Sequence, residues 1–379
     1  MNTIQRILRC ASALVGVCAA LGAVAAEPKQ PQVKPQIEVC FVLDTTGSMS
    51  GLIEGAKQKV WSIANEMVSA KPTPDLRLAL IPYRDHGDEY VTKVFDLTND
   101  IDAVYANLQQ FRADGGGDTP ESVNQALHEA VTKISWSQDR KVLKIIFLVG
   151  DSPPHMDYAN DVKYPEVCQE AMKRDLIINT VQCGNNADTT VVWKKISELS
   201  EGSFAAIAQT GGMVAIATPM DAELADLNRK LGATLIGYGG ERERRLVVAK
   251  QHAAEAAPAA VAADRLSFNA RSGVAVQGGG ELLDSLASGT VTMESVKKDQ
   301  LPAELQTLDR VALKTEIEKK LKERVALQQR VAQVSQKRET YLAQERKRLA
   351  EKGGGDSFDE TVAQTLRAQA AKKGINYGK

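Results

Sequence analysis

Hydrophobic positions recur with two different periods along residues 37–240, and the two kinds of segment alternate. Short apolar runs predict strands at residues 37–43, 76–82, 91–97, 142–149, 177–181 and 203–207. Between most of them, apolar residues recur every three or four positions, which predicts helices at 52–67, 123–134, 164–174, 190–199 and 221–235. We therefore expect an α/β fold, with a doubly wound, mostly parallel sheet.

One predicted strand differs from the others in its connection. Only the short polar loop 83–90 separates residues 76–82 from residues 91–97. So short a link allows a hairpin but no parallel crossover. The strand at 91–97 is therefore predicted to run antiparallel at an edge of the sheet.

Past residue 240 the pattern changes to a mainly helical one. Residues 241–300 give mixed short runs that predict no definite element. Residues 301–352 lack glycine and are rich in Ala, Leu, Glu, Lys, Arg and Gln, which predicts a long helix. Its apolar spacing shifts twice, so we expect packing on the rest of the chain or on a partner rather than a regular coiled coil. Residues 353–379 begin with a Gly-rich break, and a short helix is predicted at 358–371.

The amino-terminal residues have the character of a targeting segment. Residues 1–26 carry Arg6 and Arg9, then an apolar stretch, then the small residues 23–26, a pattern typical of a cleaved signal peptide. Residues 27–36 contain three prolines and predict an extended linker. We expect a periplasmic or secreted mature protein with no transmembrane helix, because no later segment is long and apolar enough.

Acidic and basic side chains are unevenly distributed between the two halves of the chain. Residues 27–240 hold 20 basic and 29 acidic side chains, whereas residues 241–379 hold 25 and 19. The opposite signs favour docking of the two halves, contact with an anionic surface, or simply solvated helix faces. We find no aromatic interleaving that would indicate nucleic-acid binding.

Three cysteines follow the predicted signal peptide, which excludes a dense disulfide scaffold. They are Cys40, Cys168 and Cys183. The last two are predicted at one edge of the sheet, so a disulfide between them is one alternative and buried free thiols are the other.

Polar residues that could bind a cation follow two of the predicted strands. Asp44, Thr46 and Ser48 come directly after the first strand, and Asp151 ends the strand at 142–149. Thr119 lies in a glycine-rich loop before a helix. An Asx turn capping the next helix would explain the first group alone. Together, these carboxylates and hydroxyls predict a divalent-cation site at the carboxyl edge of the sheet, for Mg²⁺ with Mn²⁺ or Ca²⁺ as alternatives.

In order, spacing and strand context, these three segments resemble the metal-ion-dependent adhesion site of the von Willebrand factor A domain. The resemblance covers roughly residues 37–240. It implies that Asp44, Thr46 and Ser48 correspond to the D-x-[ST]-x-S element, Thr119 to the threonine of the second loop, and Asp151 to the aspartate of the third. It further implies a cation with an open position for the carboxylate of a protein partner. Thr46 replaces the commoner serine, and Pro153-Pro154-His155 alters the third loop.

The resemblance also guides the choice between functions. The segment 83–89, Trp136 and the Pro-Pro-His turn are similar to A domains found beside atypical α-kinases and in exported bacterial proteins, although this chain has no kinase signature. We therefore predict an exported, non-enzymatic, metal-dependent adaptor. A metal-dependent hydrolase or phosphatase, and a partner of a remodelling complex, are the alternatives. His86 and His155 are expected at the same edge, as a zinc pair or in hydrogen-bonding roles.

Overall fold

The computed structural model describes residues 34–117, 119–213, 215–351 and 357–378. The predicted signal peptide, most of the predicted linker and most of the Gly-rich break lie outside these residues. No helix among the described residues has both the length and the apolar character needed to cross a bilayer.

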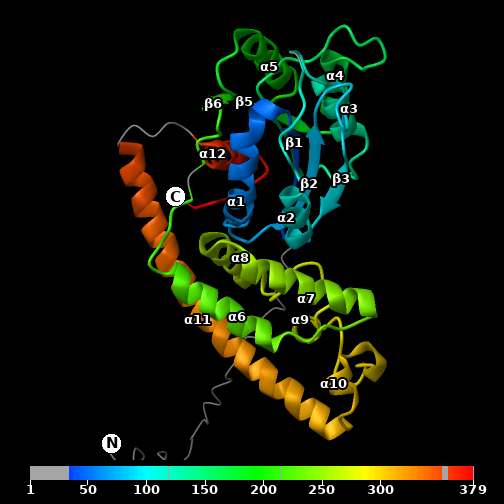
Figure 1. The fold of residues 1–379 in the computed structure, drawn as a ribbon, viewed down its shortest axis with the longest axis vertical. Coiled ribbons are helices and arrows are strands. Elements are labelled where there is room, and N and C mark those ends of the chain that lie inside the picture. Colours follow the sequence, from blue (N-terminus) through cyan, green and yellow to red (C-terminus); the bar gives the residue numbers. More distant parts are fainter. Residues whose placement is uncertain (1–33, 118, 214, 352–356, 379) are drawn as a thin grey trace, which may run out of the picture. The chain divides into compact units, whose positions relative to one another are not determined.

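Six strands form a single sheet, and their order across it is β3-β2-β1-β4-β5-β6. Their bounds are β1 (Gln36–Asp44), β2 (Asp75–Tyr83), β3 (Phe95–Thr98), β4 (Leu143–Gly150), β5 (Ile177–Cys183) and β6 (Phe204–Ile207). All neighbours pair in parallel except β2 and β3, which are antiparallel. The predicted mostly parallel sheet with one antiparallel edge strand is confirmed (Figure 1).

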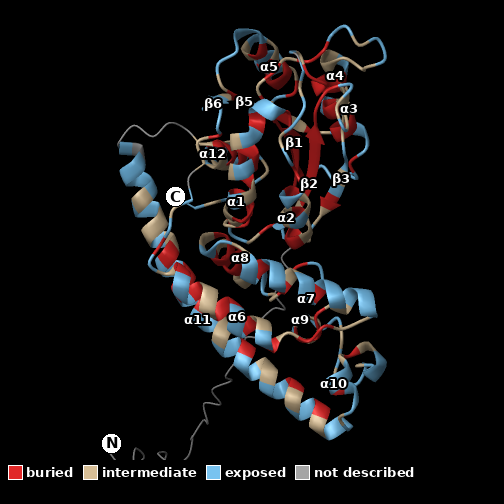
Figure 2. Ribbon diagram, viewed as in Figure 1, coloured by how far each residue is buried: buried red, intermediate tan, exposed pale blue. Residues whose placement is uncertain are grey.

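Strand β3 is shorter than predicted. It begins at Phe95 rather than residue 91, because only an isolated bridge joins Thr92 to Tyr83 and the register with β2 shifts between Leu78 and Leu80. By contrast, β1 and β4 lie at the centre of the sheet, and all eight residues of β4 are buried. Figure 2 shows the strand labelled β2, which neighbours β1, largely in red, the colour of buried residues.

Helices cover both faces of the sheet, as a doubly wound fold requires. On one face, apolar side chains of α1 (Ser50–Met67) and α2 (Ile101–Gln109) pack against the strands. On the other face, the packing helices are α3 (Val123–Thr132), α4 (Tyr164–Lys173) and α5 (Ala187–Leu199). A 3-10 turn at Gly47–Met49 precedes α1, so the first loop opens directly from β1.

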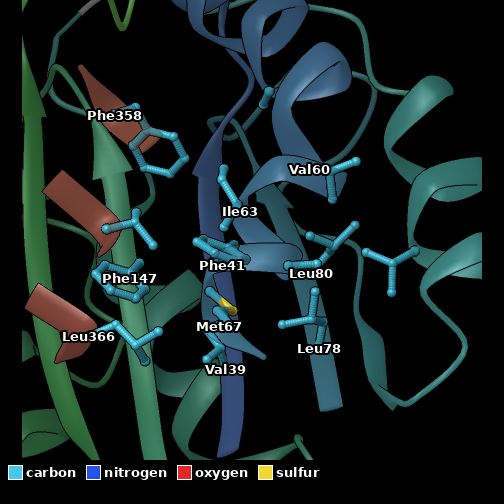
Figure 3. Close-up of a cluster of buried hydrophobic side chains, with 14 of the residues drawn as sticks. Val39, Phe41, Val60, Ile63, Met67, Leu78, Leu80, Phe147, Phe358 and Leu366 are labelled. Atoms are coloured by element: carbon cyan, nitrogen blue, oxygen red, sulfur yellow. The ribbon is translucent and has the colours of Figure 1, made fainter. Parts of the chain in front are cut away.

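The last helix of the chain also belongs to the core of the sheet. Helix α12 (Phe358–Lys372) lies beside α1, and Phe358, Val362 and Leu366 are each at most 2% exposed. The Phe358 ring meets the Phe41 ring edge-on, with centroids 6.1 Å apart. Figure 3 shows Phe358 and Leu366 packed around Phe147 and Phe41. The predicted short C-terminal helix is therefore present, and it helps to cover the sheet.

Between β6 and α12 the chain forms a helical region with its own apolar clusters. Its elements are α6 (Asp221–Thr234), α7 (Glu241–Ala256), α8 (Ala259–Ser272), α9 (Leu282–Ala287), a 3-10 turn (Lys298–Gln300), α10 (Ala303–Gln306) and α11 (Arg310–Glu351). Residues 221–235 contain the predicted helix, but its leucine stripe packs on α8 and α11 rather than on the sheet. In Figure 1, α6 and α11 lie side by side.

The shifting apolar spacing of α11 has a structural explanation. Leu313 and Ile317 pack in a cluster with α9, whereas Val331 and Val334 pack in a separate cluster with α6 and α8. Between these positions, the buried Arg324 pairs with Glu281 of the α9 segment. One helix thus meets different partners along its length, and the prediction of packing on the rest of the chain is confirmed.

Charged side chains join the helical region to the sheet, as the opposite net charges of the two halves suggested. Arg265 of α8 makes two hydrogen bonds to the carboxylate of Asp102 in α2, at 2.6 and 2.9 Å. Lys250 of α7 binds Asp100 at 2.5 Å. Asp102 and Arg265 are buried, so this pair is shielded from solvent.

The cysteines of the described chain are free and buried. Cys168 packs on the face covered by α3, α4 and α5, while Cys183 packs on the opposite face. A bridge between them would require one thiol to cross the sheet, so the disulfide alternative is not formed. Burial raises the pKa of the Cys168 thiol to about 12, which keeps it protonated.

Candidate functional site

The floor of the candidate site is the carboxyl group of Asp44, the last residue of β1. Asp44 is fully buried, and its Oδ1 accepts hydrogen bonds from the Thr46 backbone N–H at 2.9 Å and the Thr46 hydroxyl at 2.7 Å. Its Oδ2 is buried without a hydrogen-bond partner among the described residues. An orphaned buried carboxylate oxygen is costly, so a cation or water is expected to satisfy it.

Two hydroxyls stand next to this carboxyl group. The Thr46 and Ser48 hydroxyl oxygens lie 3.3 Å apart. Thr46 is buried while Ser48 is exposed, so the pair leads from the protein interior to the surface. These hard oxygen donors, together with the free Asp44 Oδ2, fit a divalent cation.

The glycine-rich second loop is held against this first loop. The Gly47 N–H donates to the Gly115 carbonyl, and the Asp114 N–H donates to the Thr45 carbonyl. Gly115 and Gly116 both have left-handed backbones, with φ of 76° and 74°. A Cβ atom on Gly116 would lie 2.8 Å from the Thr46 Cβ, so only glycine allows this approach.

Residues 84–88 brace both loops from the side. Arg84 is buried, and its guanidinium donates to the carbonyls of Thr45 and Arg112. The Asp88 carboxylate accepts from the Gly116 N–H. This segment therefore positions both loops of the site.

Asp151 reaches the site from β4, the neighbour of β1. Its Oδ2 accepts a hydrogen bond from the Gln209 side-chain amide at 2.7 Å, and the same amide donates to the Ser48 carbonyl at 3.3 Å. Gln209 follows β6, so it ties the first and third loops together from a fourth segment. Gly150, the residue before Asp151, packs against Asp44, since a Cβ atom on Gly150 would lie 2.8 Å from the Asp44 Cβ. Burial is the main cause of the raised pKa of Asp44, and repulsion from Asp151 adds to it.

Thr119 is the predicted site residue with the weakest connection to the rest. It is exposed and precedes the cis proline Pro120, and no contact to the other four site residues is recorded among the described residues. Its loop approaches Thr46 through Gly116 instead. The structure thus brings Asp44, Thr46, Ser48 and Asp151 to one edge and leaves Thr119 at the rim.

Two further residues of this edge, Tyr83 and Glu121, do not stand out in the sequence. Tyr83 ends β2 and is fully buried, with a hydroxyl that has no hydrogen-bond partner among the described residues. Glu121 is 3% exposed, and its Oε2 is likewise without one. Glu121 lies at the end of the glycine-rich loop that precedes a helix, and this position could have indicated a role at the site. Nothing in the sequence around Tyr83 separates it from an ordinary core tyrosine.

The electrostatics of the site are those of crowded, buried acids. Burial raises the pKa of Asp44 to about 7. Burial, with repulsion from Asp44, Asp85, Asp88 and Asp151, raises the pKa of Glu121 to about 9. A divalent cation would offset this repulsion and favour the ionised carboxylates.

The two histidines of this edge stack on one tyrosine. The rings of His86 and His155 lie nearly parallel to the Tyr158 ring, with centroids at 4.2 and 3.9 Å. Two rings so close cannot share one face, so Tyr158 separates them. They cannot bind one zinc ion, which needs each nitrogen within about 2.1 Å. His155 instead bonds Asp157 at 2.8 Å and lies 3.3 Å from Asp85, a hydrogen-bonding role.

Among the described residues, no three His, Cys, Asp or Glu side chains are arranged to hold a metal ion by themselves. A cation at this edge therefore depends on the Thr46 and Ser48 hydroxyls and on water as well as on carboxylates. Such mixed oxygen coordination is typical of Mg²⁺, which keeps several of its waters.

Comparison with known proteins identifies the α/β part of the chain. Residues 38–219 match the family model of the von Willebrand factor A domain. The human von Willebrand factor A domain-containing protein 7 is 35% identical over 122 residues, which cover 32% of this chain and 12% of that protein. A putative ariadne-like RING finger protein of Acanthamoeba polyphaga mimivirus is 22% identical over 232 residues, or 56% and 23% of the two chains. The chain spans less than a quarter of the length of these relatives.

Two solved structures are similar to part of the chain. The VWA domain of SpRpn10 has 13% identity and a TM-score of 0.35, over 46% of this chain and 89% of that one. Proximal thread matrix protein 1 from the mussel byssus, solved with a zinc-occupied MIDAS motif, has 14% identity and a TM-score of 0.37, over 46% and 42%. The family model thus matches residues 38–219, a little under half of the chain, as a von Willebrand factor A domain.

Proposed function

We propose that this chain is a metal-dependent protein-binding module. In this proposal Asp44, Thr46, Ser48, Thr119 and Asp151 hold a divalent cation, Mg²⁺ with Mn²⁺ or Ca²⁺ as alternatives. The cation then takes a carboxylate from an Asp or Glu side chain of a partner protein. The observation that carries the proposal is the buried Asp44 Oδ2, which lacks a hydrogen-bond partner among the described residues and stands beside two hydroxyls.

Two further points support binding rather than catalysis. Von Willebrand factor A domains are typically protein-binding modules and are generally not catalytic. In addition, the rings of His86 and His155 stack on Tyr158, and no hydrogen bond joins either of them to Thr46 or Ser48 among the described residues. The site would supply charge and open coordination rather than proton transfer.

Removing the Asp44 carboxylate is expected to abolish cation binding. Titration calorimetry should show Mg²⁺ or Mn²⁺ binding to the wild-type chain and none to Asp44→Ala, because the variant lacks the free buried oxygen. The matched control is Asp75→Ala. Asp75 is an exposed aspartate at the amino end of β2, away from the carboxyl edge where Asp44 lies, so this variant should bind the cation as the wild type does. Equal binding by Asp44→Ala would contradict the site. Partner proteins should be retained by the wild type only without chelator, and not by Asp44→Ala.

We also propose that the protein is exported and that residues 1–26 are removed. The support is the basic, apolar and small-residue order of that segment. Amino-terminal sequencing of protein recovered outside the cytoplasm should begin near Glu27. Recovery of an intact amino terminus from the cytoplasm alone would contradict export.

A further inference from the structure

Three unpartnered polar atoms gather at one place in the molecule. Seven buried side-chain nitrogen or oxygen atoms lack a hydrogen-bond partner among the described residues. Three of these, Asp44 Oδ2, Tyr83 Oη and Glu121 Oε2, come from the ends of β1 and β2 and from the segment before α3. Most buried polar groups in folded proteins are paired, so a group of three orphans at one site calls for a shared explanation.

Two glycines show how closely these atoms approach one another. A Cβ atom on Gly150 would lie 2.5 Å from the Tyr83 hydroxyl oxygen and 2.9 Å from Asp44 Oδ2. These two oxygens therefore face the same small space beside Gly150. A Cβ atom on Gly116 would lie 3.0 Å from Glu121 Oε1 and 2.8 Å from the Thr46 Cβ, so the Glu121 carboxyl stands next to Thr46.

Neighbouring side chains do not account for the Glu121 carboxyl. Neither Glu121 nor Asp44 makes an ion pair within the described part of the chain. Arg84, the buried base of the adjoining loop, donates to the carbonyls of Thr45 and Arg112 instead. The segment is held by its backbone, since the Glu121 N–H donates to the Pro153 carbonyl and its carbonyl accepts from the His155 N–H. The Glu121 side chain is thus not needed to fasten the loop.

We propose that Tyr83 and Glu121 are positioning residues behind the cation of the proposed site. In the loaded site the Tyr83 hydroxyl would orient Asp44 by donating to Oδ2, a hydrogen bond that the described structure does not contain. The Glu121 carboxylate would accept hydrogen bonds from water bound to the cation near Thr46. This inference rests on the proposed function. Groups that orient metal ligands in this way typically contribute about 10- to 100-fold to metal affinity.

Glu121 also affects the charge of the loaded site. Asp44, Asp151 and an ionised Glu121 together carry more negative charge than one divalent cation neutralises. The site should therefore hold its cation tightly and attract a partner carboxylate less strongly than two carboxylates alone would allow. Glu121 thus strengthens binding of the metal and weakens binding of the partner carboxylate.

The test is calorimetric titration of the full chain with Mg²⁺ and Mn²⁺. Glu121→Gln and Tyr83→Phe are each expected to weaken binding about 10- to 100-fold. Their apo forms should melt at or above the wild-type temperature, because Tyr83→Phe removes an unpaired buried hydroxyl and Glu121→Gln removes an acid that neighbouring carboxylates repel. A metal-induced change in tyrosine absorbance should appear in the wild type and be lost in Tyr83→Phe.

Matched controls are Glu129→Gln, a buried glutamate in α3 bonded to Thr92 and Lys133, and Tyr105→Phe, a partly buried tyrosine beside Trp61. Both should bind metal as the wild type does. If Glu121→Gln and Tyr83→Phe bind normally while Asp44→Ala does not, the inference fails and the cation site stands. If the wild type itself binds no cation, the proposed function fails.

Discussion

Replacing Phe358 with alanine is expected to lower the free energy of unfolding by about 3–5 kcal/mol, the cost typical of deleting a buried aromatic ring. Phe358 is 2% exposed and packs edge-on against Phe41 of the central strand. An apolar cavity of about 20 Å³ already adjoins it. The deletion would enlarge this cavity, and a void lined by apolar side chains stays empty of water. Urea unfolding followed by circular dichroism measures the change.

The control for this prediction is Leu349→Ala, which shortens a partly exposed leucine near the end of α11. That change should stay within about 0.5 kcal/mol, as expected of a surface position. If the two variants unfolded at the same urea concentration, α12 would not contribute to the core of the sheet in solution. A large loss in Phe358→Ala would instead show that the sheet depends on a helix that follows the helical region in the chain.

Replacing Arg265 with methionine is expected to cost about 3–5 kcal/mol, because it leaves the Asp102 carboxylate buried without its cation. The side chains of this pair are only 3% and 5% exposed, and two hydrogen bonds join them. The variant keeps most of the side-chain length, so the loss reports the unpaired charge more than a cavity. Thermal and urea unfolding of the two proteins measure the difference.

A double-mutant cycle measures the interaction energy between Arg265 and Asp102 apart from the other effects of each substitution. Adding Asp102→Asn to Arg265→Met should recover much of the lost stability, because no buried charge then remains unpaired. Arg229→Met, which breaks an exposed pair with Asp226 on α6, is the matched control and should change stability by less than about 1 kcal/mol. Equal effects of Arg265→Met and Arg229→Met would contradict a shielded contact between α8 and α2.

Together these contacts define how the helical region is attached. It leaves the sheet after β6, returns at α12, and is held to α2 by the Arg265 and Lys250 pairs. Helices α6 to α11 therefore lie in chain order between β6, a strand of the sheet, and α12, which packs on the sheet.

Much of the fold could be predicted from local pattern. The five parallel strands, the antiparallel edge strand and the long helix follow from the period of apolar residues and the length of one loop, which are properties of short segments. Helix α2 escaped prediction. It is only nine residues long and begins with a local cap, the Asp100 carboxylate accepting from the Ala103 N–H.

The residues of the candidate site likewise fall into those that the sequence indicates and those that it does not. Asp44, Thr46 and Ser48 lie within five residues and at the end of an obvious strand, so the sequence itself indicates them. Tyr83 could not be recognised as part of the site from its sequence, and Glu121 could be suspected only from its place after the glycine-rich run, because being unpartnered is a property of a residue's surroundings. The space that they face is enclosed by Gly150 and Gly116, which belong to two other segments.

The sequence by itself determined the strands and most helices of residues 37–240, the long helix near the end of the chain, the charge asymmetry of the two halves, and the oxygen-rich loop after β1. Only the tertiary structure decided what each buried face packs against. An apolar stripe shows that a helix has a buried side. It does not show which element packs against that side, because the hydrophobic effect is not directional. For this reason α6 packs on α8 and α11, while α12, from the far end of the chain, completes the core beneath the proposed cation site.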